Sequence, residues 1–183
     1  MERTYISEVS KNLEKEILLC GFVENFRNTS AMAFIVLKDI TGKGQITIEK
    51  EKHPELQEQL DVITQDSVID VVGVAHASEY VKMGGMEVFP TDIKVESVAD
   101  ALPITREAIP ATKKRPAVER SSVDQRIDYR WVDLRTEKNQ LMFKVQTLVS
   151  AALREMLIER GFLEIYTPKL IGAASESGSE VFE

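Results

Sequence analysis

One long amphipathic segment near the C-terminal end constrains this chain most. Between Thr136 and Gly161, apolar residues recur at the i, i+3, i+4 and i+7 spacings that place a single stripe on one helical face. The members of this stripe are Leu141, Val145, Leu148, Val149, Ala152, Leu153, Met156 and Leu157. Thr136 is a suitable N-cap, and Arg160 followed by Gly161 is typical of a helix C-terminus. The pattern predicts one helix, followed by a strand over residues 162–166 that ends before Pro168.

Residues 1–98 have the pattern of a small β-domain. Five segments are strand-like, and a short helical segment, Pro54–Ile63, lies between the third and the fourth. The strand-like segments are Ile17–Glu24, Met32–Lys38, Gly44–Glu49, Ser67–His76 and Met86–Glu96. This order is that of the OB-fold, a barrel whose second and third strands bind oligonucleotides. Another small barrel or sandwich remains an alternative, and Pro90 predicts an edge or a bulge in the fifth strand.

Phe34 and Gln45 are the candidate nucleic-acid-binding residues of the second and third strands. An exposed aromatic ring on a strand is a stacking platform for a base, and a glutamine amide can both donate and accept at a base edge. Alternation places Phe34 on one face of its strand, and Ala33 and Ile35 on the other. The pattern does not say which face is buried, and a phenylalanine in so apolar a run is more commonly a core residue.

The charge balance bears on any nucleic-acid partner. The chain carries 23 Lys+Arg against 30 Asp+Glu, a net charge of −7, and all of this excess lies in residues 1–98. An acidic domain argues against non-specific binding to nucleic acid, in which phosphate neutralisation dominates. A site that reads a few unpaired bases by stacking and by contacts to base edges is still compatible with it.

Composition excludes several other classes of protein. No apolar run approaches the roughly 20 residues that span a bilayer, and the first residues lack the pattern of a secretory signal or a transit peptide. Cys20, the only cysteine, is expected to be a reduced core residue of a cytoplasmic protein. With two histidines, His53 and His76, neither a zinc site nor a histidine-based nucleophilic triad is expected.

Two polar segments join the β-domain to the long helix. Residues 99–123 contain Pro103, Pro110 and Pro116, which interrupt any helix, and they read as a linker. Residues 124–135, DQRIDYRWVDLR, alternate Asp and Arg ahead of the helix. Physical chemistry alone predicts a charged collar there, in which surface ion pairs contribute only about 0–1 kcal/mol each.

Three separated blocks of the chain resemble one enzyme family. The run GFLEIYTPKL at 161–170 resembles motif 1 of the class II aminoacyl-tRNA synthetases, and the collar at 124–135 is typical of the aspartyl-tRNA synthetases of archaeal and eukaryotic type. Residues 21–27, 33–39 and 44–46 are similar to the anticodon-binding OB domain of that family. The resemblance implies an α+β chain with an anticodon-binding OB-fold barrel at 1–98, a linker at 99–123, and at 124–183 the opening of a class II α/β catalytic domain.

The resemblance also implies a tRNA site on the barrel. Phe34 matches the phenylalanine that stacks on an anticodon base, and Gln45 matches the glutamine that contacts the neighbouring base. Arg27, after the first strand, and Glu87, opening the last strand, complete the implied site. One departure concerns the loop at 28–32, where many members carry glycine and this chain has none, so the shape of the turn and the placement of Arg27 need testing.

Two further sets of residues follow from the resemblance alone. Motif 1 implies a homodimer interface that includes Gly161, Phe162 and Pro168. A mobile loop over the amino-acid pocket matches this chain at Ser175, Glu176 and Gly178. The family has a glycine where this chain has Ser177, and such a loop is expected to be stiffer here.

The implied activity belongs to a longer protein. Such an enzyme uses ATP and Mg²⁺ to join aspartate to tRNA through aspartyl-adenylate, but the arginine patterns of motifs 2 and 3 do not occur here. We therefore expect residues 1–183 to be the N-terminal portion of a synthetase, inactive alone, with no catalytic residue and no metal ligand of its own. The tRNA would be that for aspartate, or those for aspartate and asparagine. An asparaginyl-tRNA synthetase and a free-standing OB-fold module for nucleic-acid binding or dimerisation are the alternatives.

Overall fold

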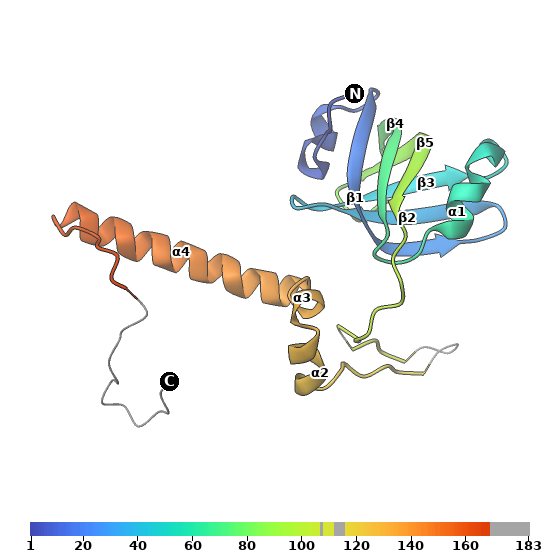
Figure 1. Cartoon of the computed structure of the whole chain (residues 1–183). Helices are drawn as coiled ribbons and strands as arrows, with labels where there is room; N and C mark the ends of the chain where they lie inside the picture. The colour runs from blue at the N-terminus through green and yellow to red at the C-terminus, as the bar shows by residue number, and fades with distance from the viewer. Residues whose placement is uncertain (107, 112–115, 169–183) are drawn as a thin grey trace. The chain divides into compact units, whose positions relative to one another are not determined.

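The computed structural model describes residues 1–106, 108–111 and 116–168. The chain divides into two compact units, Met1–Ala101 and a second that begins at Leu102 (Figure 1). The first unit is a β-barrel, and the described part of the second unit is helical. Each unit is considered by itself below.

The first unit is a closed five-stranded barrel in the strand order β1-β2-β3-β5-β4. Its strands are β1 (Glu16–Asn28), β2 (Met32–Lys38), β3 (Lys43–Glu49), β4 (Val68–Ala77) and β5 (Met86–Ser97). All neighbouring pairs are antiparallel except β3 and β5, whose parallel pairing closes the barrel. A 3₁₀ turn, η2 (Pro54–Leu56), and helix α1 (Gln57–Val62) lie between β3 and β4. The OB-fold prediction, with five strands and a helical segment in this position, is confirmed.

The barrel core decides which face of each strand is buried. Ala33, Ile35 and Leu37 of β2 have no exposed surface and belong to one apolar cluster with side chains of the other strands and of α1. Phe34 and Val36 therefore point away from the core. The sequence pattern had left this choice open, and the structure places Phe34 on the outer face.

Cys20 does not lie in the core, so the prediction of a core cysteine is wrong. Its neighbours on β1, Leu19 and Gly21, face inward, which leaves the Cys20 side chain half-buried on the outer face. Burial and a hydrogen bond with Asp70 raise the pKa of the thiol to about 11. The apolar run around Cys20 had suggested a buried position, but strand alternation, rather than local hydropathy, sets the direction of the side chain.

The bulge predicted around Pro90 is confirmed. Val72 pairs with Asp92 and Gly73 pairs with Pro90, so β5 has one extra residue, Thr91, at this point. A Cβ on Gly73 would collide with the backbone of Phe89 and Pro90, which explains a glycine at this close approach. The missing N–H of Pro90 is accommodated because the ladder is interrupted there.

A buried carboxylate attaches the N-terminal segment to the turn between β2 and β3. The 3₁₀ turn η1 (Ile6–Lys11) packs Val9 into the barrel core. Asp39 accepts hydrogen bonds from the backbone N–H of Ile6 at 2.9 Å and of Thr41 at 2.7 Å. Burial opposes the ionisation of Asp39, but these hydrogen bonds outweigh it and hold its pKa below its ordinary value. Nothing in the sequence had indicated this contact.

The second unit contains the predicted long helix. Its elements are α2 (Val123–Asp128), α3 (Arg130–Asp133) and α4 (Glu137–Glu159). Thr136 is the N-cap of α4, where its side chain accepts from the backbone N–H of Asn139, and Gly161 has the positive φ of 83° expected at a helix C-terminus. Both predicted ends of the helix are confirmed.

The strand predicted after this helix is wrong for the described residues. Residues 162–168 have no regular secondary structure and are exposed. A strand is stabilised by pairing with a second strand, and the described part of the second unit supplies no partner for these residues. The apolar stripe of α4 is likewise exposed, since none of the residues of α4 is buried.

One collar residue, Asp133, is buried, so the prediction of surface ion pairs is wrong for this residue. The Asp133 side chain has no exposed surface. It accepts hydrogen bonds from Arg120 and Arg130, both at 3.1 Å, and from Asn139 at 2.9 Å, and Arg126 lies 3.6 Å away. Burial opposes ionisation, but the hydrogen bonds from Arg120 and Asn139 and the charge of Arg126 outweigh it and hold the pKa of Asp133 below its ordinary value.

Candidate nucleic-acid interface

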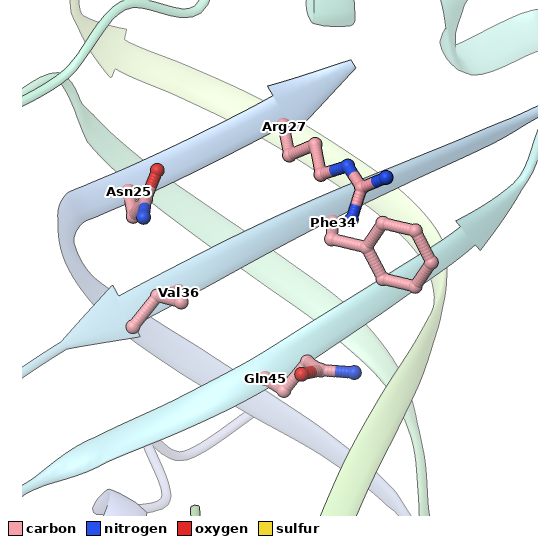
Figure 2. Close-up of a pocket in the computed structure, with 5 residues that line it drawn as sticks. All are labelled: Asn25, Arg27, Phe34, Val36 and Gln45. Atoms are coloured by element: carbon pink, nitrogen blue, oxygen red, sulfur yellow. The ribbon is translucent and has the colours of Figure 1, made fainter. Parts of the chain in front are cut away.

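The outer face of β1, β2 and β3 carries a pocket of about 300 Å³. Its lining side chains, drawn in Figure 2, are Asn25, Arg27, Phe34, Val36 and Gln45. Strand register brings them together, because Arg27 pairs with Phe34 across β1 and β2, and Val36 pairs with both Asn25 and Gln45. Three of the four residues predicted to bind tRNA therefore line one pocket.

A β-bulge at Glu24 aims Arg27 into the pocket. Val23 pairs with Leu37 and Asn25 pairs with Val36, so Glu24 is an extra residue on β1. Regular alternation from the buried Val23 would turn Arg27 toward the core. The extra residue reverses the phase, so that Arg27 faces outward while Phe26 packs against the core.

The turn before β2 forms without glycine. The Thr29 hydroxyl donates to the carbonyl oxygen of Met32 at 2.7 Å and accepts from its backbone N–H at 3.1 Å. The Thr29 N–H also donates to the same carbonyl at 2.9 Å. The threonine side chain thus closes the turn, and Arg27 lies within β1 rather than after it, because the strand extends four residues beyond its predicted end.

Phe34 has the placement of a stacking platform. It is half-buried on the outer face and does not belong to the core cluster. In Figure 2 its ring extends from β2 over the neighbouring strand β3. A half-exposed ring supported by a rigid sheet can receive the face of an unpaired base.

Arg27 carries a charge that the described residues leave uncompensated. Its side chain is exposed, and no carboxylate of the described chain lies within ion-pair distance of it. One step further along the strands, by contrast, Lys43 and Lys38 lie 2.8 and 3.4 Å from Glu24. Arg27 is thus a free cation beside the Phe34 platform, suited to a phosphate or a base edge.

Gln45 and Glu87 are joined by a residue that sequence reasoning missed. Gln45 pairs with Glu87 where β3 meets β5. The Gln45 amide nitrogen donates to the Thr47 hydroxyl at 3.1 Å, and that hydroxyl donates to Glu87 Oε2 at 2.7 Å. Thr47 is almost fully buried. Its position two residues after Gln45 on the same strand face was the available signal.

The remaining predicted residues belong to the second unit. Gly161, Phe162 and Pro168, predicted to form a dimer interface, are exposed. Ser175, Glu176 and Gly178, predicted to contact aspartate, lie outside the described residues.

The described residues contain neither a metal-binding cluster nor a membrane-spanning helix. Within residues 1–106, 108–111 and 116–168, no three His, Cys, Asp or Glu side chains are arranged to hold a metal ion. In the same ranges, every helix is too short or too polar to cross a bilayer.

Family comparisons match both units. Residues 17–96 match the family of OB-fold nucleic acid binding domains, and residues 122–183 match that of the class II tRNA synthetases (D, K and N). The chain is 38% identical to an aspartate–tRNA(Asp/Asn) ligase of Methanopyrus kandleri, over 100% of this chain and 41% of that protein. It is 35% identical to the ligase of the same name from Archaeoglobus fulgidus, over 98% of this chain and 40% of that protein.

Solved structures give the same result. An aspartyl-tRNA synthetase from Entamoeba histolytica matches 95% of this chain and 41% of its own with a TM-score of 0.81 at 29% identity. An asparaginyl-tRNA synthetase from Pyrococcus horikoshii, complexed with asparaginyl-adenylate, matches 97% of this chain and 39% of its own with a TM-score of 0.81 at 27% identity. The chain thus spans about 40% of the length of these relatives. It is similar to the class II tRNA synthetases of the D, K and N type over residues 122–183, and to the OB-fold nucleic acid binding domains over residues 17–96.

Proposed function

We propose that this chain is the anticodon-binding and motif 1 portion of an aspartate–tRNA ligase. The observation that carries the proposal is the placement of Phe34 on the outer face of the barrel, in one pocket with Arg27 and Gln45. A stacking ring, a free cation and an amide within one pocket are what a protein needs to hold unpaired bases of an RNA loop.

Each side chain has a distinct role in the proposed complex. Phe34 stacks on one anticodon base, a contact that contributes roughly 1–3 kcal/mol per base. Gln45 reads the edge of a base, and Arg27 donates to a phosphate or to a base edge. Glu87 acts from the margin of the pocket, since one of its carboxylate oxygens already accepts from Thr47.

The acidity of the barrel shapes the proposed affinity. Residues 1–98 supply the whole net charge of −7, so long-range attraction to RNA is weak and recognition depends on short-range contacts. We expect the affinity to fall with salt concentration only as steeply as one or two phosphate contacts predict.

The whole enzyme would perform a two-step reaction. The carboxylate of aspartate would attack the α-phosphate of ATP–Mg²⁺, giving aspartyl-adenylate and pyrophosphate. A hydroxyl of the terminal ribose of tRNA would then attack the aspartyl carbonyl, forming the ester and releasing AMP, in the cytoplasm. Ser175, Glu176 and Gly178 are assigned to the aspartate pocket on family resemblance.

Asparagine is the alternative amino acid. Its synthetase cannot be separated from the aspartyl enzyme by fold, because the two solved structures match this chain with the same TM-score. Both curated relatives described above are named aspartate–tRNA ligases, and both names also specify tRNA for asparagine. We propose aspartate as the amino acid, and tRNA(Asp), alone or together with tRNA(Asn), as its acceptor.

We also propose that the chain forms a homodimer through motif 1. A 23-residue helix with exposed apolar side chains, followed by an exposed Phe162, is a surface that a partner would cover. Sedimentation equilibrium tests this, with a dimer expected for the wild type and a weaker one for Phe162→Ser. A chain that stays monomeric at high micromolar concentration would contradict the proposal.

The anticodon site is tested by fluorescence anisotropy with an anticodon stem-loop of tRNA(Asp). The 183-residue chain should bind, and Phe34→Ala should weaken binding roughly 5- to 150-fold, the equivalent of one lost stacking contact. Gln45→Ala should weaken binding to the cognate loop more than binding to a loop with a changed middle base.

Tyr80→Ala is the matched control. Tyr80 is an aromatic residue that is 96% exposed, belongs to the connection between β4 and β5, and does not line the pocket. Its loss should leave binding unchanged. Equal affinities for wild type, Phe34→Ala and Tyr80→Ala would refute the anticodon assignment.

A further inference from the structure

The hydrogen-bond chain from Gln45 through Thr47 to Glu87 has a defined direction. A carboxylate only accepts hydrogen bonds, so the single proton of the Thr47 hydroxyl must point to Glu87, 2.7 Å away. The Thr47 oxygen can then only accept from Gln45, 3.1 Å away. The amide nitrogen of Gln45 is therefore the atom that faces Thr47.

The direction of the Thr47–Glu87 hydrogen bond allows only one of the two orientations of the Gln45 amide that a half-turn interchanges. If the amide turned over, its carbonyl oxygen would face the Thr47 oxygen, whose proton is already donated to Glu87. Two acceptors would then oppose each other at the nearly buried Thr47. In the observed orientation, the amide oxygen has no partner among the described residues and remains available in the pocket, where Gln45 is one of the lining residues. Figure 2 shows the Gln45 amide nitrogen extending along β3.

Amide orientation matters for the choice between the two RNA pyrimidines. On its Watson–Crick edge, uracil presents an N–H donor beside a carbonyl acceptor. Cytosine presents a ring-nitrogen acceptor beside an amino donor at the same two positions. A glutamine amide matches either base, but in opposite orientations, because it has one acceptor end and one donor end. An amide free to turn over would accept both pyrimidines, whereas one held in a single orientation distinguishes them.

We propose that Thr47 is a positioning residue that lets Gln45 distinguish uracil from cytosine, by holding its amide in one orientation through the hydrogen bond to Glu87. Thr47 touches no RNA in this arrangement and acts only through Gln45. The inference rests on the proposed function of the pocket, and it assigns pyrimidine discrimination to a buried hydroxyl that contributes nothing to the pocket surface.

The loop position is chosen first, as the one at which a base change alters binding to the wild type most and binding to Gln45→Ala least. The test then compares the affinities of the 183-residue chain for two stem-loops, one with uracil and one with cytosine at that position. The wild type should prefer one pyrimidine roughly 5- to 150-fold, the range for one well-formed amide–base pair. Thr47→Val, which keeps the shape and removes the hydroxyl, should bring the ratio of the two affinities to within about threefold of unity.

Two further variants separate positioning from simple damage. Thr47→Ser keeps the hydroxyl and should retain the wild-type ratio. Glu87→Gln can donate to the Thr47 oxygen, which frees the hydroxyl proton for the Gln45 carbonyl, so its ratio should move away from the wild-type value as in Thr47→Val. In each of these three variants, the additional substitution Phe34→Ala should still weaken binding, because the stacking platform is unchanged.

A measurement without RNA completes the design. In ¹⁵N relaxation of side-chain amides, Gln45 should be rigid in the wild type and in Thr47→Ser, and mobile in Thr47→Val. An unchanged pyrimidine ratio in Thr47→Val, with binding that still depends on Phe34, would overturn this inference and leave the anticodon site standing. Absence of loop binding in every variant, wild type included, would overturn the proposed function and this inference together.

Discussion

The barrel and helix α4 contain similarly apolar segments that end in opposite environments. In the barrel, seventeen residues form one buried cluster, and Ile35 on β2 has no exposed surface. In α4, which is 23 residues long, no side chain is buried, and Leu148 is 70% exposed. A closed barrel pairs its own strands, and its apolar core is completed by the short segments η1, η2 and α1 of the same unit.

Helix α4, by contrast, is stabilised mainly by local interactions. Its backbone hydrogen bonds are internal and its N-cap is made by Thr136, so it is locally complete. Its apolar stripe, however, obtains its burial only from another surface. A helix can thus be specified by sequence over its whole length while its apolar stripe stays exposed within the described residues.

The largest expected difference between these regions is the cost of removing an apolar side chain. Ile35→Ala should lower the free energy of unfolding of the barrel by about 2–5 kcal/mol, through lost burial and the cavity left behind. Leu148→Ala on α4 should change the free energy by no more than about 0.5 kcal/mol at a concentration where the chain is monomeric. Urea denaturation measures both values, and a similar cost for the two variants would break the comparison.

A smaller effect is expected at the buried carboxylate before α4. Asp133→Asn keeps the shape of the side chain and removes its charge, and should cost about 1.5–3 kcal/mol because hydrogen bonds from Arg120 and Arg130 lose their anionic acceptor. Amide hydrogen exchange should show the loss in the first turn of α4 and leave the barrel strands unchanged. Thr136→Ala removes the N-cap and the hydrogen bond from the Thr136 hydroxyl to the Asp133 carbonyl oxygen but keeps the carboxylate, and should cost about 1 kcal/mol.

The same carboxylate gives the collar a pH dependence. The pKa of Asp133 is lower in the folded chain than in the unfolded chain, so its contribution is complete above the ordinary value of 3.8 and is lost as the pH falls through the folded pKa. Protection of the first turn of α4 should therefore decline below pH 3.8 in the wild type. In Asp133→Asn this decline should be absent, and an identical pH profile for both proteins would contradict the assignment.

Much of this molecule was predictable from local pattern. The five strands, the helical segment between β3 and β4, and both ends of α4 follow from alternation, helical periodicity, Thr136 and Gly161, because these signals act over a few neighbouring residues. Phe34 and Gln45 were candidates by residue type and strand position, whereas Arg27 and Glu87 came only from resemblance to a family. On pattern alone, Phe34 would have been placed in the core.

The tertiary structure alone decided which side chains meet. Strand register and the extra residue at Glu24 turn Arg27 outward, since one inserted residue reverses the phase of everything after it. Asp133 is buried among three arginines, which no local pattern indicated. A hydrogen-bond chain also links Gln45 through Thr47 to Glu87, which is distant in the sequence. Periodicity specifies the face that a residue occupies within its own element, but contacts between elements depend on how the whole barrel closes. That closure is a property of all five strands at once.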